Sequence, residues 1–172
     1  MPAYIDGLEC SEVIRQQLIT SPDEKPAIIA TLNRLVRVCM DAYEGYRRAA
    51  EESRTPSLAL LFEEYAIERK QFANDLGNII IILGGEALDG HMNSGAYQRW
   101  LNLRRAIGRD DSELILGICE RSEAQAAAAY REALERIRLP SNVARLVQEQ
   151  HMQIARTHRM LQQLHLQYRL WN

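Results

Sequence analysis

The chain has few cysteines and almost no excess charge. Its three cysteines are Cys10, Cys39 and Cys119, and none of them forms a CxxC pair, so the sequence indicates neither a disulfide framework nor a zinc ribbon. The formal net charge is -2 over 172 residues, which gives no overall attraction to nucleic acid or to anionic membranes. We therefore expect no nucleic-acid partner and no membrane partner.

Long hydrophobic runs are also missing. The longest aliphatic run, Ile79–Leu83, is far too short to span a bilayer. The first ten residues, MPAYIDGLEC, have neither the charged n-region nor the apolar h-region of a signal peptide. We expect a cytoplasmic protein.

The sequence is instead rich in residues that favour helices, and strand-like alternation is almost absent. Apolar residues recur in steps of three and four along four segments, and proline and glycine lie where those segments start and stop. Pro56 follows a possible N-cap at Thr55, and Gly84 with Gly85 is a typical helix end. The sequence predicts helices over about 26–53, 56–83, 110–137 and 142–170.

The connections between these segments predict the architecture. Short turns join the first helix to the second and the third to the fourth, so each pair should form an antiparallel hairpin. Residues 84–109 are long enough to run the length of a bundle, and they include an amphipathic stretch around Trp100. We therefore predict an all-α, ferritin-like four-helix bundle over residues 25–172, in which a long crossover containing a short helix leaves the second and third helices parallel. Residues 1–24 are predicted to be an N-terminal extension whose apolar residues could form a short helix.

Polar residues on the apolar stripes are the candidates for chemistry. Bundles of this type hold two metal ions with a Glu from each of two helices and a Glu-x-x-His from each of the other two. Glu68 continues a stripe that runs through Leu61 and Tyr65, and Glu123 lies on the stripe of the third helix. His158 takes the corresponding place on the fourth helix.

Both Glu-x-x-His motifs are broken in this chain. Gln71 stands three residues after Glu68, and Ala155 stands three residues before His158. The predicted metal ligands are Glu68, Glu123 and His158, with three weaker candidates: Glu120, Glu44 and Gln71. Three interpretations remain open: a structural network in which Arg69 pairs with the carboxylates, a single bound metal ion, and a working di-metal site.

The other polar core candidates have simpler interpretations. His151, His158 and His165 repeat every seven residues, about 10.5 Å apart along one helix, so they cannot share an ion. We expect His158 alone to be buried, with His151 and His165 beside the seam. Tyrosines at core spacing, such as Tyr46 and Tyr130, should be packing residues with hydrogen-bonded hydroxyls. Cys39 and Cys119 should be small buried apolar residues.

Several motifs taken together resemble a known family. They are DAYEGYRRAAE, YAIERKQFANDL followed by LGGE, RWLNLRRAI, CERSEAQAAAAYREAL and the stretch from Gln150 to His158. In this order and spacing, over about residues 28–164, the chain resembles the uncharacterised bacterial ferritin-like four-helix-bundle proteins, a domain of unknown function. The resemblance implies the ferritin-like bundle and no particular activity. Its similarity to di-iron ferritins and rubrerythrins is more remote.

Two classes of function follow from these patterns. The first is a non-catalytic bundle with no cofactor, in which a buried polar network replaces a degraded di-metal site. The alternative is an oxidase or peroxidase that depends on iron or manganese and has an unusual ligand set. We also expect a homodimer, because the N-terminal segment and Met152, Leu166 and Leu170 are apolar positions outside the four-helix core.

Overall fold

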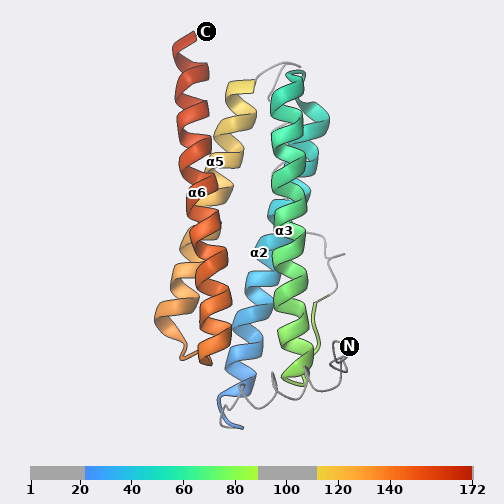
Figure 1. The fold of residues 1–172 in the computed structure, drawn as a ribbon, viewed down its shortest axis with the longest axis vertical. Helices are drawn as coiled ribbons and strands as arrows, with labels where there is room; N and C mark the ends of the chain where they lie inside the picture. The colour runs from blue at the N-terminus through green and yellow to red at the C-terminus, as the bar shows by residue number, and fades with distance from the viewer. Residues whose placement is uncertain (1–21, 89–111, 172) are drawn as a thin grey trace, which may run out of the picture.

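A computed structural model describes residues 22–88 and 112–171 of the chain. These residues form four α-helices (Figure 1): α2 (Lys25–Glu52), α3 (Pro56–Ile82), α5 (Ser112–Arg136) and α6 (Ser141–Trp171). No strand occurs in this part of the chain, so the predicted all-α class with four long helices is confirmed. Among the described residues no helix is both long enough and apolar enough to cross a membrane.

The ends of α3 follow from the residues that stand there. Pro56 occupies the first helical turn, where its missing N–H is not needed. At the other end Gly84 has φ +83°, a conformation that favours glycine, and the Gly85 N–H donates to the Ile80 carbonyl oxygen at 2.9 Å. A Cβ at Gly85 would lie 2.8 Å from the Ile29 Cγ2, so this turn also packs closely on α2. The predicted stop at the two glycines is confirmed.

Contacts between helices fix their directions. In α2, Arg34 meets Glu132 of α5 at 2.8 Å, and twelve residues later Tyr46 meets Glu123 at 2.7 Å, so α2 and α5 are antiparallel. The short turn after Glu52 makes α2 and α3 antiparallel as well, and α3 and α5 therefore run in the same direction (Figure 1). Residues 89–111, which hold Trp100 and most of the predicted crossover, lie outside the described residues, as do residues 1–21 of the predicted N-terminal extension.

The interior consists of two apolar clusters with a polar layer between them. One cluster is built around Leu32, Leu76 and Val147, and the other around Phe62 and Leu116. Along α3 the polar layer falls between Ala66 of one cluster and Phe72 of the other, and along α5 it falls between Cys119 and Ala126. Among the described residues, four charged or polar side chains are buried: Arg69, Glu123, Gln150 and Thr157. Arg69 and Glu123 occupy the polar layer between the clusters, whereas Gln150 lies within the first cluster.

From Leu61 to Glu68 the predicted stripe of α3 is wrong by one residue, although Leu58, Phe72 and Leu76 are buried as predicted. We expected Leu61, Tyr65 and Glu68 to face the core, but the structure buries Phe62, Ala66 and Arg69 instead and leaves Leu61, Tyr65 and Glu68 only partly buried. These two lines of residues are adjacent on the helix, about 100° apart, and both are largely apolar. Packing against α2 and α5 selects the second line, which puts an arginine where the sequence suggested a glutamate.

Candidate functional site

Arg69 and Glu123 form an ion pair at the centre of the bundle. Both side chains have no exposed surface. The Arg69 Nε donates to the Glu123 Oε1 at 3.1 Å, and its Nη2 donates to the Oε2 at 3.0 Å. Two parallel hydrogen bonds of this kind are the strongest and most directional arrangement available to a guanidinium and a carboxylate. The pair links α3 to α5 across the core.

Two further side chains complete the coordination of this pair. Tyr46 of α2 donates its hydroxyl hydrogen to the Glu123 Oε1 at 2.7 Å. The Arg69 Nη1 donates to the Glu68 Oε1 at 2.8 Å, and the Glu68 side chain is 32% exposed. The prediction that Arg69 lies beside at least one carboxylate is confirmed, because it contacts both. We refer to Tyr46, Glu68, Arg69 and Glu123 as the charged network.

Burial and charge act in opposite directions on Arg69. Burial alone lowers the pKa of its guanidinium, but the charge and hydrogen bonds of Glu123 outweigh that effect, so the net shift is upward from the ordinary value of 12.5. Burial, followed by the charge of Glu123, raises the pKa of the Tyr46 hydroxyl well above 10. At neutral pH Arg69 is therefore a fixed cation, and Tyr46 is a fixed hydrogen-bond donor.

A second, uncharged group of buried polar residues lies on the other side of Phe72. The Tyr130 hydroxyl donates to the Gln150 Oε1 at 2.8 Å, and the Cys39 Sγ lies 3.0 Å from the Tyr130 oxygen. Since the single hydroxyl hydrogen is directed to Gln150, the Cys39 thiol is the donor in the other contact. The Gln150 Nε2 in turn donates to the Phe72 carbonyl oxygen at 3.4 Å. We refer to Cys39, Tyr130 and Gln150 as the neutral network.

The Cys39 thiol of the neutral network is buried and protonated. Burial raises the pKa of Cys39 to about 12, although the charge of Arg69 acts in the opposite direction. A thiol with such a pKa is almost wholly protonated at neutral pH and is a poor nucleophile. The expectations for Cys39 and Cys119 as buried residues, and for Tyr46 and Tyr130 as packing residues with hydrogen-bonded hydroxyls, are confirmed.

His158 does not lie where the sequence placed it. Thr157 is buried at 6% exposure, whereas His158 is only partly buried, as are His151 and His165. Val147, Ile154 and Leu161 are fully buried, so the apolar seam of this helix lies where its spacing predicts, and only His158 falls beside it. His158 has no hydrogen bond or ion pair within the described parts of the chain, so it does not join Glu68 and Glu123.

The three weaker candidates lie apart from the charged network. Glu44 is on the surface, with its carboxylate 3.8 Å from Arg47. Gln71 is exposed and donates to Asp75 at 2.8 Å. Glu120 of α5 meets the His165 Nδ1 of α6 at 2.6 Å. Within residues 22–88 and 112–171, no three His, Cys, Asp or Glu side chains converge as a metal site requires.

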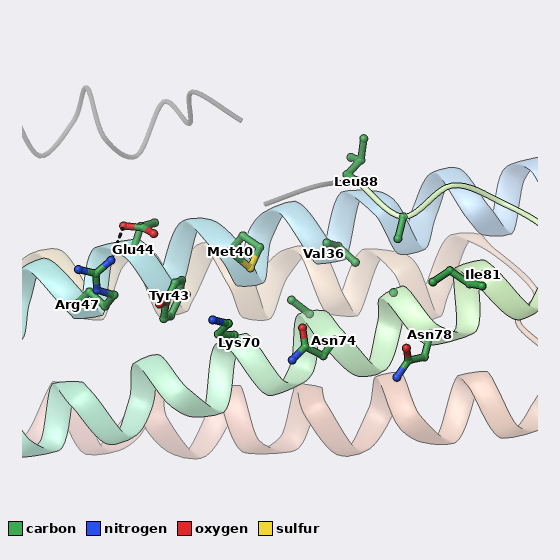
Figure 2. Close-up of a pocket in the computed structure, with 13 residues that line it drawn as sticks. Val36, Met40, Tyr43, Glu44, Arg47, Lys70, Asn74, Asn78, Ile81 and Leu88 are labelled. Atoms are coloured by element: carbon green, nitrogen blue, oxygen red, sulfur yellow. Dashed lines mark ion pairs between the residues drawn. The ribbon is translucent and has the colours of Figure 1, made fainter. Parts of the chain in front are cut away.

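A groove of about 740 Å³ lies on the outer side of α2 and α3 (Figure 2). Met40 and Ile81 supply apolar surface to this groove, and small residues such as Gly77 also line it. At one end the Lys70 Nζ lies 5.3 Å from the centre of the Tyr43 ring. Neither Arg69 nor Glu123 lines this groove, so it is separate from the polar layer.

The sequence of this chain matches a known protein family. Residues 27–136 match the family described as Domain of unknown function (DUF2383), and this match covers more than half of the chain. The chain belongs to this family. The matched segment contains α2, α3 and α5, and with them the whole charged network, while Gln150 of the neutral network follows it. No protein with a curated description matches the chain.

Gln150 is the buried polar residue that reasoning from sequence missed. It lies three residues after Val147 and four before Ile154, both of which are fully buried, so its spacing marks a core position. The sequence therefore contains the signal for its burial. Arg69 is harder to place from sequence, because a long charged side chain is rarely fully buried unless it is paired.

Proposed function

We propose that this protein is a non-catalytic, ferritin-like bundle in which the Arg69 guanidinium takes the place of metal cations between two carboxylates. The observation that carries this proposal is the two-bond contact between Arg69 and Glu123, with both side chains fully buried. A buried charge requires a partner, and here the partner is part of the chain itself. The bundle then acts through its surface rather than through its core.

The parallel direction of α3 and α5 supports the ferritin-like topology. Successive helices that run the same way need a connection as long as the bundle, and the 29 residues from Leu83 to Asp111 are sufficient for this.

The residues present do not fit a di-metal centre. Arg69 already neutralises Glu123 and contacts Glu68, so a dication at these oxygens would have to displace a buried guanidinium. Ala155 supplies no carboxylate, Gln71 is exposed, and His158 lies off the buried line. The metal-dependent oxidase or peroxidase therefore remains the alternative that this donor set favours less.

Metal loading of protein purified without chelator tests this proposal. Iron(II) or manganese(II) is added under anaerobic conditions, and after desalting the metal retained per chain is measured for wild type, Glu68→Gln and Glu123→Gln. Glu149→Gln, an exposed change on α6, is the control. We expect retention well below one ion per chain and no difference among the four proteins.

The opposite result has a clear form. Two tightly held ions per chain in wild type and in Glu149→Gln, lost in Glu68→Gln or Glu123→Gln, would overturn the proposal. Peroxide turnover that follows the same pattern would then assign the iron- or manganese-dependent activity.

A further inference from the structure

Asn33 of α2 holds the chain where it leaves α3. Its Nδ2 donates to the Glu86 carbonyl oxygen at 3.0 Å, and its Oδ1 accepts a hydrogen bond from the Leu88 N–H at 3.0 Å. One side-chain amide therefore binds two backbone groups and fixes both the position and the direction of residues 86–88. The chain passes in this way from the end of α3 onto the outer side of α2.

Ala87 and Leu88 lead directly into the groove on the outer side of α2 and α3, and both residues line it. A Cβ on Gly77 would lie 3.6 Å from the Ala87 Cβ, so the chain lies close to the groove side of α3 as well. From Val36 the groove runs toward Arg47, in the direction of the turn between α2 and α3 (Figure 2). The described chain thus ends inside the groove and not beside it.

The chain that follows must travel in the same direction as the groove. Because α3 and α5 are parallel, the contact between Arg69 and Glu123 sets a common level for both helices. Ser112 lies eleven residues before Glu123, and Gly77 lies eight residues after Arg69, so the two are about 28.5 Å apart along the bundle. Residues 89–111 would span about 34 Å even as one continuous helix. The path along the groove is therefore within their reach.

The sequence of this connection has the pattern of a segment that binds a groove. Tyr97, Trp100, Leu103 and Ile107 recur in steps of three and four. An amphipathic helix with such a stripe typically lays its apolar side chains into a groove between two other helices. The groove of about 740 Å³ offers apolar surface for them, including that of Met40.

The charges of the two partners are opposite. Glu63 lies seven residues, or two helical turns, before Lys70 and therefore shares the groove side of α3. It is exposed and has no ion-pair partner among the described residues. Residues 99–109 contain four arginines and no acidic residue, and they directly precede the end of the bundle at which Ser112 and Glu63 lie. Opposite charge favours this pairing.

We propose that the groove of α2 and α3 is the docking site of residues 97–109 of the same chain, with Trp100 in the groove and the following arginines toward Glu63. Because Asn33 already holds residues 86–88 at the groove, the segment is present there at high effective concentration. The docking depends on the directions of the helices, and it holds whether or not the core binds a metal ion.

Contact quenching of a bimane dye by an indole tests this docking. The dye is attached at Asn74→Cys or at Asn78→Cys, two positions along the groove. The protein also carries Cys10→Ser and Trp171→Phe, so that Trp100 is its sole tryptophan and the remaining two cysteines are buried. We expect the emission of the dye at one or both positions to rise several-fold when Trp100→Phe is added. Circular dichroism verifies that each protein is folded.

Two controls show that the quenching belongs to the groove. A dye at Gln163→Cys, exposed on α6, should emit equally with and without Trp100. Gly77→Glu places a charge in the groove, and its Cβ makes only an ordinary contact with Ala87, so the helix should tolerate it. This variant should displace the segment and restore the emission in the groove, whereas Ala124→Glu, exposed on α5, should leave the quenching intact.

Three results would overturn the proposal. Emission that is independent of Trp100 at both groove positions would leave the groove open to a separate partner. Quenching that survives Gly77→Glu would place the tryptophan outside the groove. Quenching that disappears on dilution would assign the groove to the segment of a second copy.

Discussion

The charged and the neutral networks solve the same problem with different chemistry. Each brings polar atoms from several helices into the core, and each satisfies them with hydrogen bonds of about 2.7–3.4 Å. In the charged network the partners are ions, so removing one of them leaves the other as a buried charge without compensation. In the neutral network each lost partner leaves only a dipole without a hydrogen bond. Single substitutions should therefore lower the free energy of unfolding much more in the charged network than in the neutral network.

The largest expected effect is on Arg69 and Glu123. Replacing Arg69 with Met, or Glu123 with Leu, should lower the free energy of unfolding by about 3–5 kcal/mol, because the remaining charge is buried without compensation. Urea denaturation at neutral pH measures this. The double variant should recover most of the loss, since an apolar pair of similar volume needs no ionic partner.

The exposed pair of Arg34 and Glu132 is the matched control for this experiment. It also joins two helices at 2.8 Å, but its side chains are 44% and 36% exposed. Removing either partner should cost far less than removing Arg69 or Glu123, because solvent screens the exposed pair. Equal losses at the two sites would contradict the charged network as the ionic centre of the core.

Part of this contrast was visible in the sequence, and part of it was not. Glu123 falls on a single narrow apolar stripe, so its burial could be predicted from spacing alone. On α3 two neighbouring lines of residues are both apolar, one through Leu61 and the other through Phe62, and spacing cannot choose between them. The choice depends on the packing of all four helices, and it puts Arg69 rather than Glu68 in the core.

The ends of the helices were easier to predict than their rotation. Pro56 and Gly84 act locally, through a missing donor and a left-handed backbone, so no tertiary information is needed. Rotation of α6 places Thr157 in the core and His158 beside it. That result follows from contacts with three other helices, which a one-dimensional pattern does not contain.

Alkaline pH should weaken the neutral network through Cys39. The pKa of its thiol is about 12 in the folded protein and 9.0 as a reference, so the unfolded chain loses this proton first as the pH rises. The contribution is complete below pH 9 and is lost progressively as the pH approaches 12, by about 1.4 kcal/mol per pH unit. By pH 11 the cost is therefore about 2–3 kcal/mol.

Urea titrations of wild type and Cys39→Ala at pH 8 and pH 11 measure this effect. The tyrosines titrate in both proteins, so the difference between the two isolates the thiol. We expect wild type to lose more stability than Cys39→Ala between the two pH values. Identical losses would show that burial does not hold the thiol protonated.

Gln150 should come next in size. In Gln150→Leu the Tyr130 hydroxyl loses its acceptor, at an expected cost of about 1–3 kcal/mol. Adding Tyr130→Phe to this variant removes the unpaired hydroxyl and should restore part of the loss. A Gln150→Leu protein as stable as wild type would mean that the amide does not join the two helix pairs.

The smallest effect lies outside both networks, where His165 packs over Gly117. A Cβ on Gly117 would come within 3.0 Å of the His165 Cε1, and the same ring makes the 2.6 Å contact with Glu120. Replacing a helical glycine with alanine ordinarily stabilises a helix by about 0.5–1 kcal/mol. Here the ring must move to make room, so Gly117→Ala should gain less than that. In the His165→Ala background the obstacle is gone, and the same substitution should give the full gain. A double-mutant cycle by urea denaturation measures the difference, and a gain that does not depend on His165 would mean that the ring yields without cost.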